Sequence, residues 1–414
     1  MRVVHTSDWH LGQELYSFDR GVEHEEFLRW LGDQLVDLDA DALVVAGDLF
    51  DSVNPPVAAQ RRLYQFLHRT TNEMPGIQIV IVGGNHDSAA RVELPAPLLD
   101  ETRVTLVGGM PRANGRLDPA RVLTTLRGKD GTARVLCATV PYLRPSDLPI
   151  VQPGESAAKA LYDLVLDAAD AVRERLPLLV TGHLHVQGAQ VSELSERRIM
   201  VGGEEAVSAD IFPSSVNYVA LGHLHRPQAV GGKEHVRYAG APFPMSVAEK
   251  DYTHGIVVVD FGDTDVHEIR TIAIPRPVAF LRVPATRAVS LEEAEELLRN
   301  LDVQDPGADR RPFLEIAVRL DTPAPDMRPR VDAALEGKPV RLTRVLREVA
   351  GQDRGRGPAT EADIGLEELQ PQAVFVSCHQ TQYGSPPPER LLQAFNEILA
   401  SVQNPNDTPD GSEG

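Results

Sequence analysis

The chain has 414 residues, which is too long for one ordinary hydrophobic core. Of these residues 42% are hydrophobic, as in a globular protein. Its 60 acidic residues outnumber its 41 basic residues, and the formal net charge of −19 argues against a basic nucleic-acid coat protein, although an enzyme that uses bound cations is not excluded. No run approaches the roughly 20 apolar residues that a membrane helix needs. The N-terminus opens on a strand pattern without a charged and then apolar leader, so we expect a cytoplasmic protein.

Residues 1–273 alternate strand-like and helical patterns, which predicts an α/β domain. Apolar, β-rich runs predict strands over Arg2–Thr6, Ala42–Ala46, Ile77–Val82, Leu178–Thr181, Arg197–Val201, Val216–Leu221, His235–Tyr238 and Gly255–Phe261. Apolar residues at helical spacing predict helices over Val22–Leu38, Pro56–His68 and Ala157–Leu176. We therefore expect two sheets packed face to face as a β-sandwich, with helices outside.

Two prolines within Ile274–Pro277 mark a boundary, and a smaller α+β pattern then predicts a capping domain over residues 274–350. Its expected strands are Ala279–Val283, Phe313–Leu320 and Val340–Val349, and its expected helices are one capped by Ser290 and one over Pro325–Leu335. Residues 351–385 are expected to form a linker and the end of this domain. An amphipathic helix is expected over residues 386–402, and the polar residues 403–414 are expected to be disordered.

Five short motifs place metal-binding side chains directly after five of the predicted strands. They are Asp8-Trp9-His10, Gly47-Asp48-Leu49-Phe50-Asp51, Gly84-Asn85-His86-Asp87, Gly182-His183 and Gly222-His223-Leu224-His225. A buried strand fixes the backbone while the loop after it frees the side chain, so we expect the five motifs to converge. The glycines at 47, 84, 182 and 222 each precede a predicted ligand, and they let the backbone turn sharply and approach closely.

The residue types in these motifs predict a hydrolytic metal centre. Imidazole, carboxylate and amide oxygen without thiolate suit manganese, iron or zinc. The set is too large for one ion, and two ions about 3.5–4 Å apart, bridged by a carboxylate, would activate a water against phosphorus. Any one of the histidines alone would more often be a buried, hydrogen-bonded residue, and it is the ordered set that favours metal binding.

These motifs resemble those of the calcineurin-like metallophosphoesterases, whose pattern is Asp-x-His, Gly-Asp-x-x-Asp, Gly-Asn-His-Asp, Gly-His and Gly-His-x-His. The segment 47–51 followed by Pro55-Pro56, and the segment 84–91, resemble more narrowly the SbcD-type nuclease subunits of the double-strand-break repair nuclease family. The motifs cover the first 225 residues, and beyond residue 270 the likeness rests on the order of the domains. The resemblance implies that residues 1–273 form a metallophosphoesterase nuclease domain.

The resemblance also implies a role for each motif position. Asp8, His10 and His225 would hold one manganese ion, Asn85, His183 and His223 would hold the other, and Asp48 would bridge them. His86 would act as acid or electrostatic stabiliser at the scissile phosphate, without binding metal. Asp51 and Asp87 would orient their neighbours. His185 lies where the family uses only the preceding histidine, and iron or another divalent metal is an alternative to manganese.

The resemblance implies a manganese-dependent DNA nuclease, which would act as a 3′–5′ exonuclease on duplex ends and as an endonuclease on single strands and hairpins. The enzyme would take part in DNA end processing, repair and recombination, and would be associated with the nucleoid in the cytoplasm. Its partner would be the SbcC ATPase, an SMC-like protein, in a heterotetramer built on a homodimer of the nuclease subunit. One alternative is a metallophosphatase or phosphodiesterase that acts on small phosphoesters. Another is a non-catalytic DNA-end scaffold, which predicts missing ligands, and none is missing.

Three surfaces are candidates for contacts with macromolecules. Basic residues near the motif loops that could contact DNA, or be merely solvated, are Arg61, Arg62 and Arg91. Apolar residues of the helix 56–68 that would pack across a dimer axis, or in the core of one subunit, are Leu63, Phe66 and Leu67. The stripe of the last helix, which would bind the ATPase or dock on its own capping domain, is Leu391, Leu392, Phe395, Ile398 and Leu399.

Overall fold

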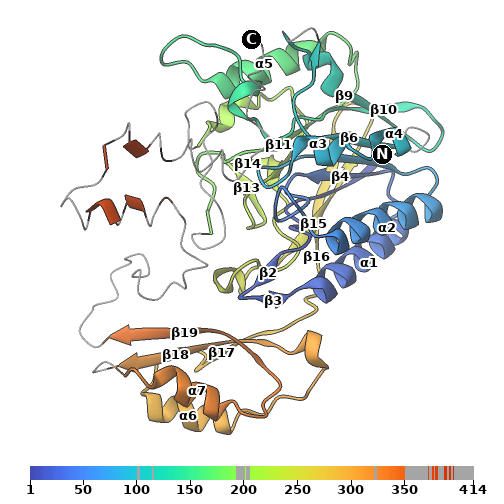
Figure 1. Ribbon diagram of the computed structural model, residues 1–414. Helices are drawn as coiled ribbons and strands as arrows, with labels where there is room; N and C mark the ends of the chain where they lie inside the picture. The colour runs from blue at the N-terminus through green and yellow to red at the C-terminus, as the bar shows by residue number, and fades with distance from the viewer. Residues whose placement is uncertain are drawn as a thin grey trace, which may run out of the picture. The chain divides into compact units, whose positions relative to one another are not determined.

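The computed structural model describes residues 1–99, 103–113, 116–192, 201, 206–320 and 324–349, and positions 372, 375, 376, 378–380, 387, 388, 391, 392 and 395. The chain divides into two compact units (Figure 1). The first comprises Met1–Leu281, Val303–Leu314 and Pro339–Thr343, and the second comprises Arg282–Asp302, Glu315–Lys338 and Arg344–Gly414. In the part of the chain described, no helix has the length and apolar character to cross a membrane.

The first unit is built on two six-stranded sheets. One has the order β16 (Val266–Ala273), β15 (Gly255–Phe261), β1 (Arg2–Thr6), β4 (Ala42–Ala46), β5 (Gln78–Val82) and β6 (Val104–Val107). The other has the order β13 (Gln228–Val230), β14 (Lys233–Tyr238), β12 (Tyr218–Gly222), β11 (Leu178–His183), β10 (Ala133–Ala138) and β9 (Leu123–Arg127). Within each sheet the four strands β1, β4, β5, β6 and the four strands β10, β11, β12, β14 run parallel, so their carboxyl ends share one edge.

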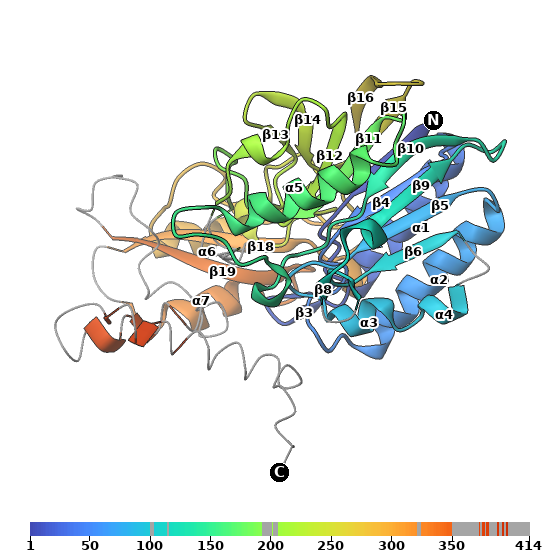
Figure 2. The same cartoon turned by 90° about the horizontal axis from the view of Figure 1, so that it is seen from above.

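The two sheets pack face to face between layers of helices. The helices α1 (Gly21–Asp37) and α2 (Val57–Glu73) pack on the first sheet, and α5 (Ala157–Asp170) packs on the second (Figure 2). Strand β4 is apolar throughout because both of its faces are buried. Leu43 and Val45 pack towards the helices, while Ala42 and Val44 pack in the core between the sheets. The predicted sandwich with helices outside is therefore confirmed.

Short elements fill the connections of the first unit. They are β2 (Glu14–Leu15), β3 (Phe18–Asp19), α3 (Ala89–Glu93), α4 (Ala96–Leu99), β7 (Arg112–Ala113) and β8 (Arg116–Leu117). The second unit contains α6 (Leu291–Arg299), α7 (Met327–Ala334) and most of a sheet with the order β17 (Phe280–Val283), β18 (Phe313–Leu320) and β19 (Arg341–Val349). The predicted cap of α6 is present, because the Ser290 hydroxyl accepts from Glu293 N at 3.2 Å.

The structure corrects the predicted helix ends in two places. Helix α2 continues to Glu73 instead of ending at His68. Helix α5 ends at Asp170 instead of Leu176. The predicted apolar stripe includes Val172, but this side chain is 59% exposed and lies outside the core. The strand predicted over residues 197–201 lies outside the described residues except for Val201.

The side chains predicted to form a dimer face are part of the core of one chain. Leu63, Phe66 and Leu67 are 4%, 5% and 3% exposed and pack with residues of α1 and the first sheet. The alternative of core packing is therefore the one that the structure supports, because the apolar spacing of α2 faces its own sheet. The exposed apolar side chains in this region are instead Val57, Tyr64, Leu94 and Leu98.

The tail-helix residues are only partly described. Leu391 is 44% exposed. Phe395 stacks on Phe375 of the same unit, with ring centroids 4.2 Å apart and ring planes at 6°. Ile398 and Leu399 lie outside the described residues.

Candidate metal centre

The five motifs converge at the carboxyl ends of the parallel strands. The loop after β1 and the loop after β4 run side by side, with Asp8 N donating to Gly47 O and His10 N to Asp48 O, each at 3.0 Å. The second sheet contributes His183 at the end of β11 and His223 just after β12. Both sheets thus deliver side chains to the same place, although the motifs span more than two hundred positions of sequence.

One half of the centre consists of Asp8, His10 and His225, whose ligand atoms all lie within 4.8 Å of one another. The Nε2 atoms of His10 and His225 are 3.2 Å apart and face each other. The Asp8 carboxylate is held by two donors, His223 N at 2.8 Å and the Ser7 hydroxyl at 2.6 Å. The three side chains are at most 3% exposed, so a bound ion would be surrounded by protein on this side.

The other half consists of Asp48, Asn85, His183 and His223. His183 Nε2 lies 3.3 Å from Asp48 Oδ2 and 2.9 Å from Asn85 Oδ1, and His223 Nδ1 lies 3.2 Å from the same amide oxygen. Asp48 Oδ2 is also 3.7 Å from His10 Nε2, in the first half. Asp48 therefore lies between the two halves, where a bridging carboxylate belongs.

The backbone at this site adopts conformations that L residues rarely take. Positive φ angles occur at Asp8 (53°), His10 (44°), Asp48 (47°) and His223 (97°). Such conformations cost about 1–3 kcal/mol each and persist where the surrounding structure enforces them, typically at functional sites.

The glycines next to the ligands are required by close approach. A Cβ at Gly84 would lie 2.1 Å from Asp48 Oδ1, and a Cβ at Gly222 would lie 1.9 Å from Ala46 O. Gly47 adds a positive φ of 89°. The predicted sharp turn therefore holds at Gly47, while at Gly84 and Gly222 the decisive factor is space.

The buried charges shift each other's pKa. Burial alone would raise the pKa of Asp48, but the imidazoles of His183 and His86 outweigh it and hold the pKa well below its usual value. Burial lowers the pKa of His183, yet the Asp48 carboxylate overcomes this and raises it to about 9. Burial and the neighbouring His183 hold the pKa of His223 well below its usual value. Burial raises the pKa of Asp8.

These residues fit a divalent cation. The donors are carboxylate, amide and imidazole, the types that manganese, iron and zinc accept. Among the described residues neither Asp8 nor Asp48 has an ion pair with lysine or arginine, and the charged partners that lie nearest are imidazoles. A buried pair of carboxylates without such a partner is costly unless a cation or a proton compensates it.

His86 lies beside the first half and, like Asn85, is partly exposed, whereas the other predicted ligands are buried. Its ring is perpendicular to that of His10, with centroids 4.8 Å apart. Its Nδ1 lies 2.7 Å from Asp51 O, and since a carbonyl can only accept, Nδ1 carries the proton. The opposite ring nitrogen, Nε2, is then the atom that can take up a proton and release it.

Two further carboxylates, Asp87 and Asp51, lie beside the motif loops. Asp87 accepts from the N–H groups of Leu49, Phe50 and Gly84 at 2.9–3.0 Å and so joins the two motif loops. Burial, and then the charge of Asp48, raise its pKa to about 6. Asp51 Oδ1 lies 3.2 Å from His10 Nδ1, in a geometry that falls short of a hydrogen bond.

Several supporting residues carry no signal in the sequence. His24 lies 3.0 Å from the carbonyl oxygens of both His10 and Arg20. Arg20 is 1% exposed and forms a two-pronged ion pair with Glu23 at 2.7 Å. Glu249 lies 2.9 Å from His225 Nδ1. They could not be found from spacing, because their contacts are made through tertiary folding.

The remaining predicted residues lie outside this cluster. The groups of potential ligands among the described residues do not include His185. Arg91 donates to Asn54 Oδ1 at 2.6 Å, and Arg62 lies against Gly21. A role of Arg61, Arg62 and Arg91 in DNA binding stays a prediction.

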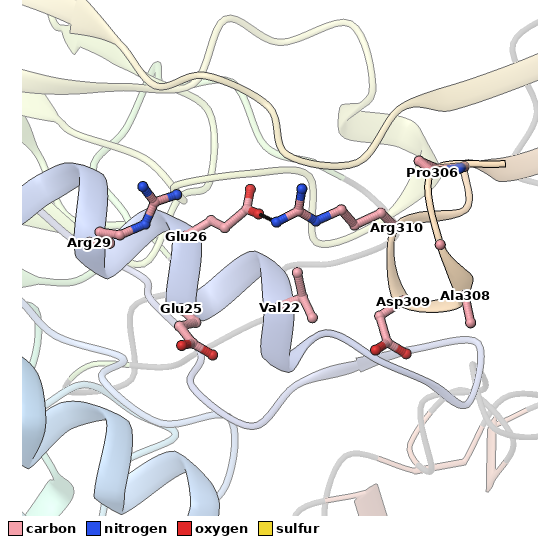
Figure 3. A pocket seen from close by; sticks show the side chains of 9 residues that line it. Val22, Glu25, Glu26, Arg29, Pro306, Ala308, Asp309 and Arg310 are labelled. Atoms are coloured by element: carbon pink, nitrogen blue, oxygen red, sulfur yellow. Dashed lines mark ion pairs between the residues drawn. The ribbon is translucent and has the colours of Figure 1, made fainter. Parts of the chain in front are cut away.

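A pocket of about 450 Å³ lies elsewhere in the first unit and contains none of the predicted ligands. It is lined by Val22, Glu25, Glu26 and Arg29 of α1 and by residues 306–310, and Arg310 pairs with Glu26 across it (Figure 3). Its charges are mixed in sign, so they select no ligand class.

Comparison with known proteins agrees with the site. Residues 1–227 match the family of calcineurin-like phosphoesterases, and residues 275–383 match a family described as the type 5 capsule protein repressor C-terminal domain. The chain is 39% identical to the D subunit of the nuclease SbcCD from Rhodobacter capsulatus, over 91% of this chain and 94% of that protein. Identity to the same protein is 32% in Escherichia coli K12, over 91% and 92%, and 28% in Bacillus subtilis, over 97% and 99%. The predicted resemblance is confirmed: the chain belongs to the calcineurin-like phosphoesterases and, within them, to the family of SbcCD nuclease D subunits, and is a hydrolytic phosphodiesterase.

Proposed function

We propose that this chain is a manganese-dependent DNA nuclease with two adjacent ions. In this proposal Asp8, His10 and His225 hold one ion, Asn85, His183 and His223 hold the other, and Asp48 bridges them. The observation that carries the proposal is the convergence of these seven side chains from five strand ends, six of them buried and Asn85 partly exposed, with Asp48 between the two halves. Two bound divalent ions would supply an activated water and neutralise charge at phosphorus.

The protein's own part in the reaction is positioning and proton transfer. The fixed loops after β1, β4, β5, β11 and β12 orient the donors before any substrate arrives, which lowers the cost of reorganisation. His86, held through Nδ1 by Asp51 O, presents Nε2 to the scissile phosphate, and in its doubly protonated form it would pass the Nε2 proton to the leaving oxygen and return to the neutral ring. Asp87 keeps the loops of Asp48 and His86 in register.

The substrates proposed are duplex DNA ends, cut in the 3′–5′ direction, together with hairpins and single strands. The name of the relatives places them in a complex called SbcCD. We infer that the present chain forms such a complex, with an SbcC-type ATPase as its partner and a homodimer of the nuclease subunit within a heterotetramer. In this proposal a capping domain follows residue 273, and the tail helix is the segment that binds the partner. The dimer would use the exposed Val57, Tyr64, Leu94 and Leu98.

The test is cleavage of a labelled hairpin and a labelled duplex by the full chain, with and without the ATPase partner. We expect manganese to support cleavage and His86→Ala to abolish it while both ions still bind. His267→Ala, on an exposed position of β16, is the matched control and should cleave as the wild type does. Hydrolysis of small phosphoesters with no cleavage of DNA under any condition would favour the rival phosphatase and overturn the proposal.

A further inference from the structure

The segment after β14 contains a buried carboxylate that belongs to none of the motifs. Glu249 is 0% exposed and ends the short helix Val247–Glu249. Its Oε1 lies 2.9 Å from His225 Nδ1, and its Oε2 accepts from Met245 N at 2.8 Å. The two oxygens therefore have separate roles, because one faces a predicted metal ligand and the other anchors the carboxylate to its own segment.

The contact between Glu249 and His225 fixes the state of the imidazole. When Glu249 is ionised its oxygens only accept hydrogen bonds, so His225 Nδ1 then carries the proton. In the neutral ring, Nε2 then keeps its lone pair, and this atom faces His10 Nε2 at 3.2 Å inside the first half of the centre. The Glu249 charge also makes Nε2 a stronger donor to a cation.

The two imidazoles of the second half, His183 and His223, have different hydrogen-bond partners. His183 Nδ1 lies 3.0 Å from the backbone carbonyl of Ala46, which is uncharged. His223 turns its Nδ1 towards Asn85 in the second half of the centre. In the described part of the chain, Glu249 is thus the buried carboxylate behind the first half, and the second half has a neutral backbone group in the equivalent place.

The Glu249 segment also braces the loop that carries His10. Gln13 Nε2 donates to Met245 O at 3.0 Å, and Arg20 Nη1 donates to Pro244 O at 2.6 Å. Gln13 N in turn donates to His10 O at 2.9 Å. Residues 244–249 therefore link two ligands of the same half, His10 and His225, that are far apart in the sequence.

We infer that Glu249 is a positioning residue that selectively sets the metal affinity of the half formed by Asp8, His10 and His225. The inference rests on the proposed two-ion site. Removing a carboxylate behind a metal-bound histidine typically weakens metal affinity by about 10–100-fold. That loss should fall on one ion, because the imidazole that Glu249 contacts, His225, belongs to the first half.

The experiment measures manganese binding to the full chain by calorimetry and by electron paramagnetic resonance, with Glu249→Gln and Glu249→Ala. The wild type should bind two ions and give the spectrum of a magnetically coupled pair. Glu249→Ala should weaken one ion by about 10–100-fold and, at limiting manganese, give the spectrum of a single uncoupled ion. Glu249→Gln, which keeps a hydrogen-bonding oxygen without the charge, should lie between them. Glu315→Gln, at a buried carboxylate of the second unit, is the matched control.

The outcomes separate this inference from the proposed function. If the wild type binds no pair of ions, the two-ion proposal itself fails. If the wild type binds two and Glu249→Gln binds both unchanged, or loses both equally, the positioning role of Glu249 is overturned. Circular dichroism of each variant identifies a folding defect, and the milder Glu249→Gln then decides.

Discussion

At Gly222 there is no room for a side chain, because a Cβ would lie 1.9 Å from Ala46 O, an atom of β4 in the other sheet. Gly222→Ala should therefore push β12 away from β4 and lower stability by about 1–3 kcal/mol or more, as overpacked sites do. Manganese affinity should fall with it, since His223 follows directly. Thermal unfolding and metal titration measure the two effects.

Gly76→Ala is the control for this substitution, because nothing lies within 4 Å of its added Cβ. A change within about 0.5 kcal/mol is expected there. Equal stabilities of Gly222→Ala and Gly76→Ala would show that the close approach of the two strands is not real.

Metal binding at His183 should depend on pH. Without metal, burial lowers the pKa of His183, but the Asp48 carboxylate outweighs burial and raises the pKa to about 9. The folded chain therefore holds a proton on His183 that the ion must displace. Manganese affinity should rise about tenfold per pH unit between about pH 7 and pH 8.5 for this one proton. The same proton stabilises the metal-free fold below its ordinary pKa of 6.5, and this stability is lost as the pH rises through about 9.

Asp48→Asn removes the charge that raises the pKa of His183. The variant should bind manganese weakly, and its residual affinity should show a shallower pH dependence. Competition with a metal-sensitive dye at several pH values gives both slopes. A wild-type affinity that does not change over this range would contradict the coupling between Asp48 and His183.

At the scale of elements, helix α2 has two faces with different consequences. Leu63 is 4% exposed, and Leu63→Ala should cost about 2–5 kcal/mol in urea unfolding by leaving a cavity. Tyr64, the next residue, is 37% exposed, and Tyr64→Glu should leave the unfolding midpoint nearly unchanged.

The outer face is where the proposed dimer is tested. Light scattering should show a folded monomer for Tyr64→Glu combined with Leu98→Glu, since Leu98 is 86% exposed. An unchanged dimer in this double variant would place the interface elsewhere, and a monomeric wild type would dismiss the dimer altogether.

The sequence predicts the bounds of an element well where the apolar pattern begins and ends with that element. The predicted bounds of β4 and β5, whose residues are all buried, lie within a residue of the observed ones. The predicted end of α5 is wrong, because the apolar pattern continues through Val172 after the chain has left the sheet. The face that α2 presents is also ambiguous in the sequence, since an apolar stripe has the same spacing whether it meets its own sheet or another chain.

At the scale of the whole molecule, the local motifs predict which side chains meet. Asp8, Asp48 and His183 come together because each lies at or just after the carboxyl end of a parallel strand, a position that the sequence reveals. The contacts of Glu249 and His24 could not be predicted, because they depend on how segments without a motif fold back over the loops. Supporting residues are therefore visible only in three dimensions.

The proposed nuclease activity requires that side chains between residues 8 and 225 form one cage for two neighbouring cations. Anomalous X-ray diffraction from crystals of the full chain soaked in manganese tests it most directly. We expect two anomalous peaks about 3.5–4 Å apart. One should lie beside Asp8, His10 and His225 and the other beside Asn85, His183 and His223, with Asp48 touching both. An empty cage in fully soaked crystals, or a single peak bound by other residues, would contradict it.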